Sequence, residues 1–336
     1  MKILLDEGER GQIQELLDHA VARFQSAEQP EFVAEATVLA HELPRRVRVT
    51  LNEFRLREPA AALCTISGYP IDEERIGLTP AHWKERQRCC KPVREEMLLV
   101  LTGSLLGDVI AWATQQDGAV VHDIVPIKEH ESEQLGSGSK EELTWHTEDA
   151  FHPFRGDYLG MMCLRNTDQV PTTFATIDTS ELDARTLGLL FEPHYTIRPD
   201  NSHLSKHRMS PADNGLTAAH ERIDEMVARP EKIPLFYGSP EAPYFRLDPY
   251  FMDPPEDPAA REALEKVIRL VDSRLENLLL EPGEVCFIDN FRAVHGRRPF
   301  KPRYDGKDRW LKRINITRDL RRSRTARPSS EARALA

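Results

Sequence analysis

The sequence Leu143-Thr144-Trp145-His146-Thr147-Glu148 has the composition of a short β-strand and contains two side chains that can bind a metal. Side chains two positions apart in a strand point to the same face, so His146 and Glu148 are expected to converge. A third candidate ligand, His295, follows the apolar segment 285–289 and a short polar turn, and we expect this strand to deliver it from the opposite sheet edge. Two imidazoles and one carboxylate can occupy one face of an octahedral metal and leave three positions open, the arrangement of a non-haem Fe(II) oxygenase.

This metal assignment has alternatives. A His-x-Glu pair is common on protein surfaces, and a lone histidine such as His295 is usually an ordinary core or surface residue. The carboxylate favours a hard, redox-active metal over structural zinc, which prefers Cys and His. A hydrolytic zinc enzyme and a protein that binds metal and amino acid without turnover are the competing hypotheses from other functional classes.

Length and composition limit the class of protein. The 336 residues suffice for one large domain or two small ones, and 40% apolar residues can form a sizeable core. A formal net charge of −10 argues against nucleic-acid binding, and no apolar run approaches the roughly 18–20 residues of a membrane span. The acidic N-terminus lacks a signal-peptide core, and five cysteines without a CxxC motif fit a reducing compartment. We therefore expect a cytoplasmic protein of unknown oligomeric state, without nucleic-acid or membrane partners.

Helical patterns dominate the first sixty residues and recur later. Apolar residues repeat at three- and four-residue spacing in 13–24, and helix formers continue through 32–51. The strongly apolar segment 95–106 predicts another helix. Two more helices are expected at 180–190 and 258–280.

Short strands prevail from residue 118 onward, and turn signals separate them. Besides an earlier strand near 62–66, the candidates are 119–127, 143–148, 160–164, 172–177, 194–197, 232–237, 244–247, 284–288 and 309–317. Many short strands with few helices indicate a closed or double-sheet core of jelly-roll type. We therefore predict an α+β fold in one domain (1–336), with a mainly helical part (1–60), a β core with helical insertions (118–318) and a basic tail (319–336).

The composition of two stretches is typical of mobile loops. Residues 129–140 include Gly136-Ser137-Gly138-Ser139 and directly precede the metal motif, so this segment is a candidate lid. Residues 198–214 are polar and rich in Pro and Asn. They form either a second active-site loop or an ordinary surface loop.

The predicted strand 309–317 places two arginines, Arg309 and Arg313, on one face. Guanidinium groups directed into a β core need carboxylate partners, because an unpaired buried charge is very costly. Arginine binds carboxylates in a bidentate manner, so a dicarboxylate co-substrate and an amino-acid carboxylate would satisfy both. Internal salt bridges to Asp or Glu are the simpler alternative.

Six segments together indicate a family: HELPRRVR (41–48), WATQQDG (112–118), WHTEDAFHPFRGDYLG (145–160), RPDNSHL (198–204), FIDNFRAVHGRRPF (287–300) and PRYDGKDRWLKRINITRDLRRSR (302–324). They are spread over nearly the whole chain. The chain resembles the clavaminate-synthase-like Fe(II)/2-oxoglutarate oxygenases, and among them the free amino-acid hydroxylases of peptide-antibiotic pathways, such as the arginine β-hydroxylase of viomycin biosynthesis. The resemblance implies a distorted double-stranded β-helix (jelly-roll) core with flanking helices.

The resemblance also implies a cofactor and its ligands. Iron would be bound by His146, Glu148 and His295, with 2-oxoglutarate and O2 as co-substrates. The distal carboxylate of 2-oxoglutarate would bind Arg309, and Thr172 would contribute a hydroxyl group.

Further residues are implied to bind a small-molecule amino-acid substrate. Arg313 would pair with its α-carboxylate, and Gln115 and Glu148 would contact its α-amino and carboxylate end. Asp200 and Ser137 would contribute additional substrate contacts.

The expected side-chain pocket departs from the family pattern. Related arginine hydroxylases have two acids as D-x-D after an Arg-Leu or Arg-Val pair, whereas this chain has Arg246-Leu247-Asp248-Pro249-Tyr250. Asp248 can pair with a guanidinium, and the phenol of Tyr250 can stack on it or accept a hydrogen bond. The resemblance thus implies hydroxylation at Cβ or Cγ of a free L-amino acid, with L-arginine as first choice. Desaturation of arginine, or hydroxylation of citrulline, enduracididine or lysine, is the alternative.

Overall fold

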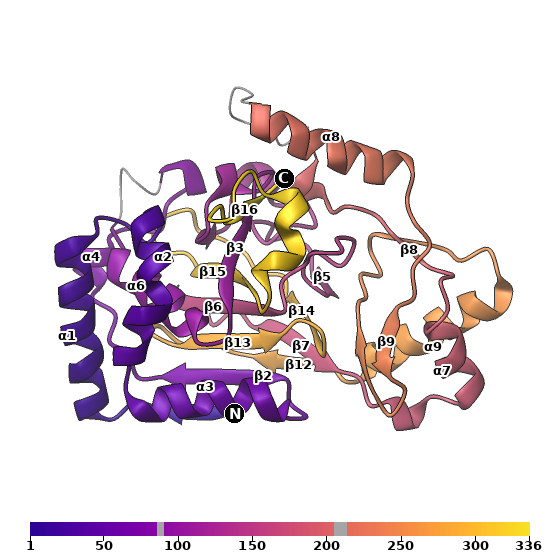
Figure 1. Cartoon of the computed structure of the whole chain (residues 1–336), viewed down its shortest axis with the longest axis horizontal. Coiled ribbons are helices and arrows are strands. Elements are labelled where there is room, and N and C mark those ends of the chain that lie inside the picture. The colour runs from indigo at the N-terminus through magenta and orange to yellow at the C-terminus, as the bar shows by residue number, and fades with distance from the viewer. Residues whose placement is uncertain (86–90, 205–213) are drawn as a thin grey trace.

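The computed structural model describes residues 1–85, 91–204 and 214–336 (Figure 1). Its centre is an eight-stranded sheet, built mostly from antiparallel pairs. The strand order is β1 (Lys2–Leu4), β2 (Leu63–Ser67), β13 (Val285–Asp289), β6 (Tyr158–Arg165), β15 (Trp310–Thr317), β3 (Asp108–Trp112) and β16 (Ala334–Leu335), and β4 (His122–Ile124) also pairs with β15.

Strand β6 is buried at all eight positions, which explains its continuous apolar sequence Tyr-Leu-Gly-Met-Met-Cys-Leu-Arg. A strand with both faces covered has no need of the apolar–polar alternation that marks a half-exposed strand. Gly160 lies at its centre, where an added Cβ would come within 2.8 Å of Ile314 Cγ1 and 2.9 Å of Phe287 Cε1. The neighbouring side chains therefore fill the space above this glycine.

A second, four-stranded antiparallel sheet contains the predicted metal ligands. Its order is β12 (Glu276–Leu278), β7 (Thr172–Thr176), β14 (Ala293–Arg297) and β5 (Leu143–His146). The pairing of β14 with β5 places His295 opposite His146, and a register irregularity follows between His295 and Arg297. Residues of both sheets, including Met161 and Leu311 from the large one, line a common pocket.

Helices of the N-terminal part cover the large sheet at one end of the molecule (Figure 1). Helix α6 (Val93–Ser104) packs on β15 and β6, with α1 (Glu7–Arg23) and α2 (Pro30–Leu39) behind it, and α3 (Arg45–Arg57) packs on β2. The first turn of α1 has a capping box between Asp6 and Glu9. The predicted helical character of the first sixty residues and of 95–106 is confirmed.

The opposite end contains a separate apolar cluster around α7 (Ala184–Leu190) and α9 (Pro258–Ser273), which pack on each other. Trp145 of β5 and Val294 of β14 belong to this cluster, so it supports the small sheet from behind. Further elements are α4 (Glu73–Ile76), α8 (Asn214–Ala228) and two short antiparallel pairs. One is the hairpin of β9 (Phe236–Ser239) and β10 (Ala242–Phe245), and the other joins β8 (Thr196–Ile197) to the distant β11 (Met252–Asp253). Among the described residues, no helix combines the length and apolar character needed to cross a membrane.

Three sequence-based expectations are wrong in detail. The helix predicted at 258–280 ends at Ser273, because residues 276–278 pair with the edge of β7 despite their helical propensity. His295 follows the predicted strand, which is β13, but it also lies in the middle of a further strand, β14, which was not predicted because it is buried at all its positions and so lacks alternation. Strand β3 was not predicted. Of the predicted loop 198–214, residues 205–213 lie outside the described residues.

We expect Gly160→Ala to destabilise the fold by about 1–3 kcal/mol, because a Cβ there overpacks the core between the side chains of Ile314 and Phe287. Gly11→Ala in α1 is the matched control. No atom lies within 4 Å of its added Cβ, so this change should stabilise the protein by about 0.5–1 kcal/mol. Urea denaturation measures both changes, and equal effects of the two substitutions would contradict the packing argument.

Candidate metal centre and active site

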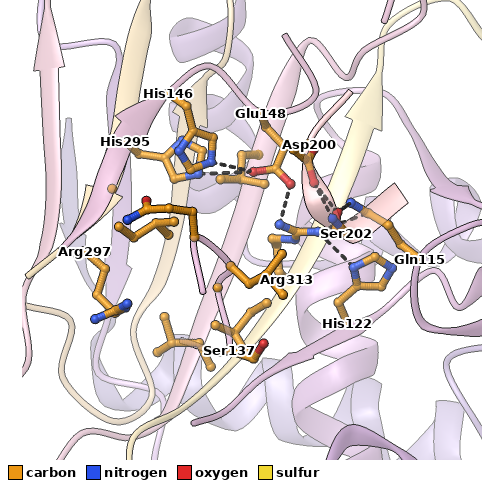
Figure 2. Close-up of a pocket in the computed structure, with 18 of the residues that line it drawn as sticks. Gln115, His122, Ser137, His146, Glu148, Asp200, Ser202, His295, Arg297 and Arg313 are labelled. Atoms are coloured by element: carbon orange, nitrogen blue, oxygen red, sulfur yellow. Dashed lines mark hydrogen bonds and ion pairs between the residues drawn. The ribbon is translucent and has the colours of Figure 1, made fainter. Parts of the chain in front are cut away.

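Two histidines and one glutamate converge at one side of the pocket (Figure 2). Nε2 of His295 lies 3.3 Å and Nε2 of His146 3.5 Å from Oε2 of Glu148. His146 ends β5, whereas Glu148 lies just beyond the strand end. All three candidate ligand atoms lie within 4.8 Å of one another. Chain segments about 150 residues apart thus present a facial set of two nitrogens and one oxygen, which suits Fe(II).

Hydrogen bonds behind these ligands orient them. Nδ1 of His146 donates to the carbonyl of Thr144 at 2.9 Å, so in the neutral ring Nε2 presents its lone pair to the cluster. The backbone N–H of Glu148 donates to Asn290 Oδ1 at 2.8 Å, and Asn290 Nδ2 donates back to the Glu148 carbonyl at 3.0 Å. Nδ1 of the buried His295 has no hydrogen-bond partner among the described residues. The donor set and its supports fit a bound divalent metal.

The pKa values of all three candidate ligands are shifted from their ordinary values. Burial opposes ionisation of Glu148, but the guanidinium of Arg313 and the two imidazoles outweigh it and hold the pKa well below its ordinary value. Burial lowers the pKa of His295 to about 4. Burial also disfavours the charged form of His146, but Glu148 and Asp248 outweigh it and raise the pKa to about 9. An ionised Glu148 and a neutral His295 are the states that metal ligation requires, whereas His146 must lose a proton.

Arg313 lies on the other side of Glu148. Its Nη1 forms an ion pair with Glu148 Oε1, and its Nη2 donates to Gln115 Oε1 at 3.2 Å and lies 3.0 Å from Nδ1 of His122 (Figure 2). The alternative of an internal salt bridge therefore holds for this arginine. The other two partners in these contacts, Gln115 and His122, are not carboxylates, so the guanidinium can still bind a further carboxylate.

Arg309 has no such internal partner. Its side chain is only 5% exposed, Nη2 donates to Thr172 Oγ1 at 3.0 Å, and no carboxylate of the described residues forms an ion pair with it. Burial lowers its pKa to about 10. Since an unpaired buried guanidinium is costly, this site is built for an anion that the described part of the chain does not supply.

The residues predicted for the substrate side chain occupy different environments. Asp248 is 7% exposed, burial raises its pKa to about 7, and no lysine or arginine among the described residues pairs with it. Its Oδ1 accepts a long hydrogen bond of 3.3 Å from the Phe251 N–H. Tyr250 also lines the pocket but is 54% exposed, so it lies at the rim.

The other predicted substrate residues line the same pocket. Asp200 precedes the 3-10 turn Asn201–His203, and its Oδ1 accepts from Ser202 Oγ at 2.5 Å. Ser137 belongs to the predicted lid segment, and its Oγ lies 2.8 Å from Nδ1 of His130.

Several pocket residues were not predicted. His122 contacts Arg313, Ser202 binds Gln115, and the buried Arg297 donates to the carbonyls of Glu141 and Arg298 at 3.2 and 2.9 Å. Ser202 lies in the motif RPDNSHL, so the sequence contained a signal for it. His122 and Arg297 reach the site through strand pairing, which no local pattern reveals.

Comparisons with known proteins agree with this geometry. Residues 102–315 match the model of the family described as taurine catabolism dioxygenase TauD, TfdA family. The chain is 42% identical to enduracididine beta-hydroxylase of Streptomyces hygroscopicus, with 98% of each chain covered. It is 44% identical to L-ornithine/L-arginine 3-hydroxylase of Catenulispora acidiphila, with 95% of each covered.

A solved structure is also closely similar. The non-heme iron oxygenase OrfP in complex with Fe, succinate and (3S)-hydroxy-L-Arg superimposes with a TM-score of 0.94 at 47% identity, and all of each chain is covered. The family resemblance inferred from the sequence motifs is thereby confirmed. The chain belongs to the TauD/TfdA family of dioxygenases.

Proposed function

We propose that the chain is an Fe(II)- and 2-oxoglutarate-dependent oxygenase that hydroxylates Cβ or Cγ of a free cationic L-amino acid, with L-arginine as the first candidate. The observation that supports it most is the charge pattern of one pocket. A buried arginine (Arg309) and a buried aspartate (Asp248) both lack ion-pair partners among the described residues, and a two-histidine, one-carboxylate cluster lines the same cavity. A dicarboxylate and a cationic side chain would satisfy the two charges.

In this proposal His146, Glu148 and His295 hold the iron, which together with 2-oxoglutarate supplies the oxidant for an aliphatic C–H bond. Arg309 and Thr172 bind the distal carboxylate of 2-oxoglutarate, since Thr172 already orients the guanidinium. The protein's contribution is to fix both reactants and to exclude water from the buried site.

The amino-acid end of the substrate would meet Arg313, Gln115 and Glu148. The α-carboxylate would bind the guanidinium of Arg313, and the α-ammonium would approach Glu148 and the Gln115 side-chain oxygen. Asp200 and Ser137 complete this wall of the pocket. Because Glu148 would touch both metal and substrate, the α-carbon is held close to the iron.

Asp248 gives the preference for a cationic side chain. Neutral citrulline would leave the carboxylate of Asp248 without a counter-charge, whereas the cationic side chain of arginine, ornithine or enduracididine would provide one. Two of the relatives are named for hydroxylation of enduracididine and of ornithine and arginine, which supports this substrate class. We further propose an antibiotic-type pathway as the biological setting, and desaturation remains the alternative outcome at the same C–H bond.

The fold proposed for this function is a distorted double-stranded β-helix within one domain of residues 1–336. Two features support it. Consecutive strands alternate between the two sheets, as in β13, β14 and β15, and both sheets line the pocket. The relatives match over nearly the whole chain.

The iron-loaded protein should convert 2-oxoglutarate to succinate in an oxygen- and amino-acid-dependent manner. A panel of arginine, homoarginine, ornithine, enduracididine, lysine and citrulline, analysed by mass spectrometry and product NMR, would identify substrate and position. We expect a mass gain of one oxygen with the cationic members. Absence of turnover across this panel would refute the enzyme hypothesis in favour of a binding protein.

Arg309→Lys should raise KM for 2-oxoglutarate by roughly 10-fold or more, because lysine keeps the charge but cannot form the bidentate hydrogen bonds of a guanidinium, and a hydrogen bond to a charged group is worth about 1.5–3 kcal/mol. The KM for arginine should change little. Anaerobic titration of the visible charge-transfer band with 2-oxoglutarate provides a second measurement. Arg298→Lys is the matched control, since Arg298 pairs with the partly exposed Glu142 outside the pocket lining. A normal KM for 2-oxoglutarate in R309K would contradict the assignment.

Asp248→Asn should lower kcat/KM for arginine by about 10- to 100-fold, because a charge-assisted hydrogen bond is lost. It should affect citrulline much less. With a pKa near 7, Asp248 is partly protonated at neutral pH and gains its charge as pH rises. The wild-type kcat/KM for arginine should therefore increase between pH 6 and 8, and this increase should be smaller in D248N. Identical pH profiles would exclude Asp248 as the cation site.

A further inference from the structure

A second buried cluster of titratable groups lies directly behind the amino-acid end of the pocket. The imidazole of His203 is fully buried and packs edge-on against the rings of Trp112 and Phe151. Its Nε2 donates to Asp149 Oδ1 at 2.9 Å, which leaves Nδ1 to accept from the hydroxyl of Thr114 at 2.7 Å. Both ring nitrogens therefore have a hydrogen-bond partner, and these bonds restrict the orientation of the ring.

This cluster is not a second metal centre, although the donor atoms of Asp149, Asp200 and His203 lie close enough together to hold an ion. Its contacts are those of a hydrogen-bond network. Both oxygens of Asp149 accept hydrogen bonds, Oδ2 from Trp112 Nε1 at 2.5 Å and Oδ1 from His203. Oδ1 of Asp200 accepts from both the N–H and the hydroxyl of Ser202, and its Oδ2 lies 3.7 Å from Nε2 of His203. The cluster therefore connects His203 to residues on two chain segments.

Those neighbours are the pocket residues. His203 is the last residue of the 3-10 turn that begins next to Asp200 and includes Ser202, both of which line the pocket. Nε2 of Gln115 donates to Ser202 Oγ at 2.6 Å and lies 3.0 Å from Nε2 of His203. Figure 2 shows Asp200, Ser202 and Gln115 grouped beside Arg313. Two separate chain segments therefore meet at His203, and together they form the wall that faces the amino-acid end.

We propose that His203 is a positioning residue that locks the Asp200–Ser202 turn against the Thr114–Gln115 segment and thereby preorganises the subsite for the α-amino and α-carboxylate groups. This inference rests on the proposed function, because it assumes an amino-acid substrate at that wall. His203 itself does not line the pocket. Its effect is transmitted through Gln115 and Ser202.

Loss of His203 should affect the kinetics of the amino-acid substrate. A looser Asp200–Ser202 turn would weaken binding of the amino acid and displace its reacting C–H bond from the metal. A misplacement of about 1 Å can lower the rate about 100-fold. The proposed co-substrate subsite is formed by Thr172 of β7 and by Arg309, which directly precedes β15, so it should keep its geometry. A substitution of His203 should therefore change the kinetic and binding constants for the amino acid but leave those for 2-oxoglutarate nearly unchanged.

The test compares H203F with wild type in the iron-loaded full-length chain. We expect KM for arginine to rise about 10- to 100-fold, with KM for 2-oxoglutarate within about twofold of wild type. Succinate should form in excess over hydroxylated product, since 2-oxoglutarate can be consumed without hydroxylation when the amino acid is poorly held. The anaerobic band formed with 2-oxoglutarate should be normal, while its shift on adding arginine should require much higher concentrations.

His152 provides the matched control. It is buried, packs on the same Trp112 ring at 4.4 Å between centroids, and accepts the Phe154 N–H at 3.0 Å, but it does not line the pocket. H152F should alter thermal stability without selectively raising KM for arginine. Equal KM effects in H152F and H203F would show that His203 has only a packing role and would overturn the inference.

Two milder variants keep the inference testable if H203F does not fold. H203Q retains a donor toward Asp149 and should partly restore KM, whereas T114V removes only the hydroxyl that binds His203 Nδ1 and should raise KM for arginine severalfold. Unchanged KM for arginine in both would overturn the proposal. Failure of the proposed function is distinguishable, because wild type itself would then show no amino-acid-dependent turnover.

Discussion

The antiparallel pairing of β5 with β14 is the constraint on which the site depends. It sets His146 opposite His295 and so brings two imidazoles from distant parts of the chain to 4.6 Å between ring centroids. A register slip of one residue would turn one imidazole to the opposite face. The apolar cluster behind the small sheet, which includes Trp145 and Val294, fixes that register because both side chains alternate with the ligands.

The second constraint is charge. Strand β15 and its preceding residue place two arginines in the pocket, and the chain neutralises them differently. Arg313 is balanced by Glu148, a residue that also belongs to the candidate metal cluster, whereas among the described residues Arg309 has a hydrogen bond to a threonine hydroxyl and no ion pair. In the proposed function, Glu148 would therefore link the metal to the amino-acid end of the substrate. A metal cation at Glu148 would weaken the attraction between Glu148 and Arg313, and the guanidinium could then bind a carboxylate.

The sequence predicted those parts of the site that follow from local periodicity. His146 with Glu148, and Arg309 with Arg313, line one pocket as predicted, although Glu148 lies just beyond the end of β5 and Arg309 just before β15, so strand alternation was only an approximate guide. The strand that contains His295 was missed, since a strand buried on both faces lacks that alternation. His122 and His203 could not be predicted either, because their positions depend on long-range pairing and on a buried network.

The environments of Asp248 and Tyr250 change how substrate selection is understood in this chain. Asp248 is buried, whereas Tyr250 is mostly exposed at the rim, so in the proposed function a single buried carboxylate would face the far end of the substrate. One charge would select a cation but leave the side chain free to pivot about it. The position of the reacting C–H bond would then be set mainly from the amino-acid end, where Arg313, Gln115 and Ser202 are joined by hydrogen bonds. On this hypothesis, one end of the substrate determines which side chain is accepted, and the other end determines which carbon reacts.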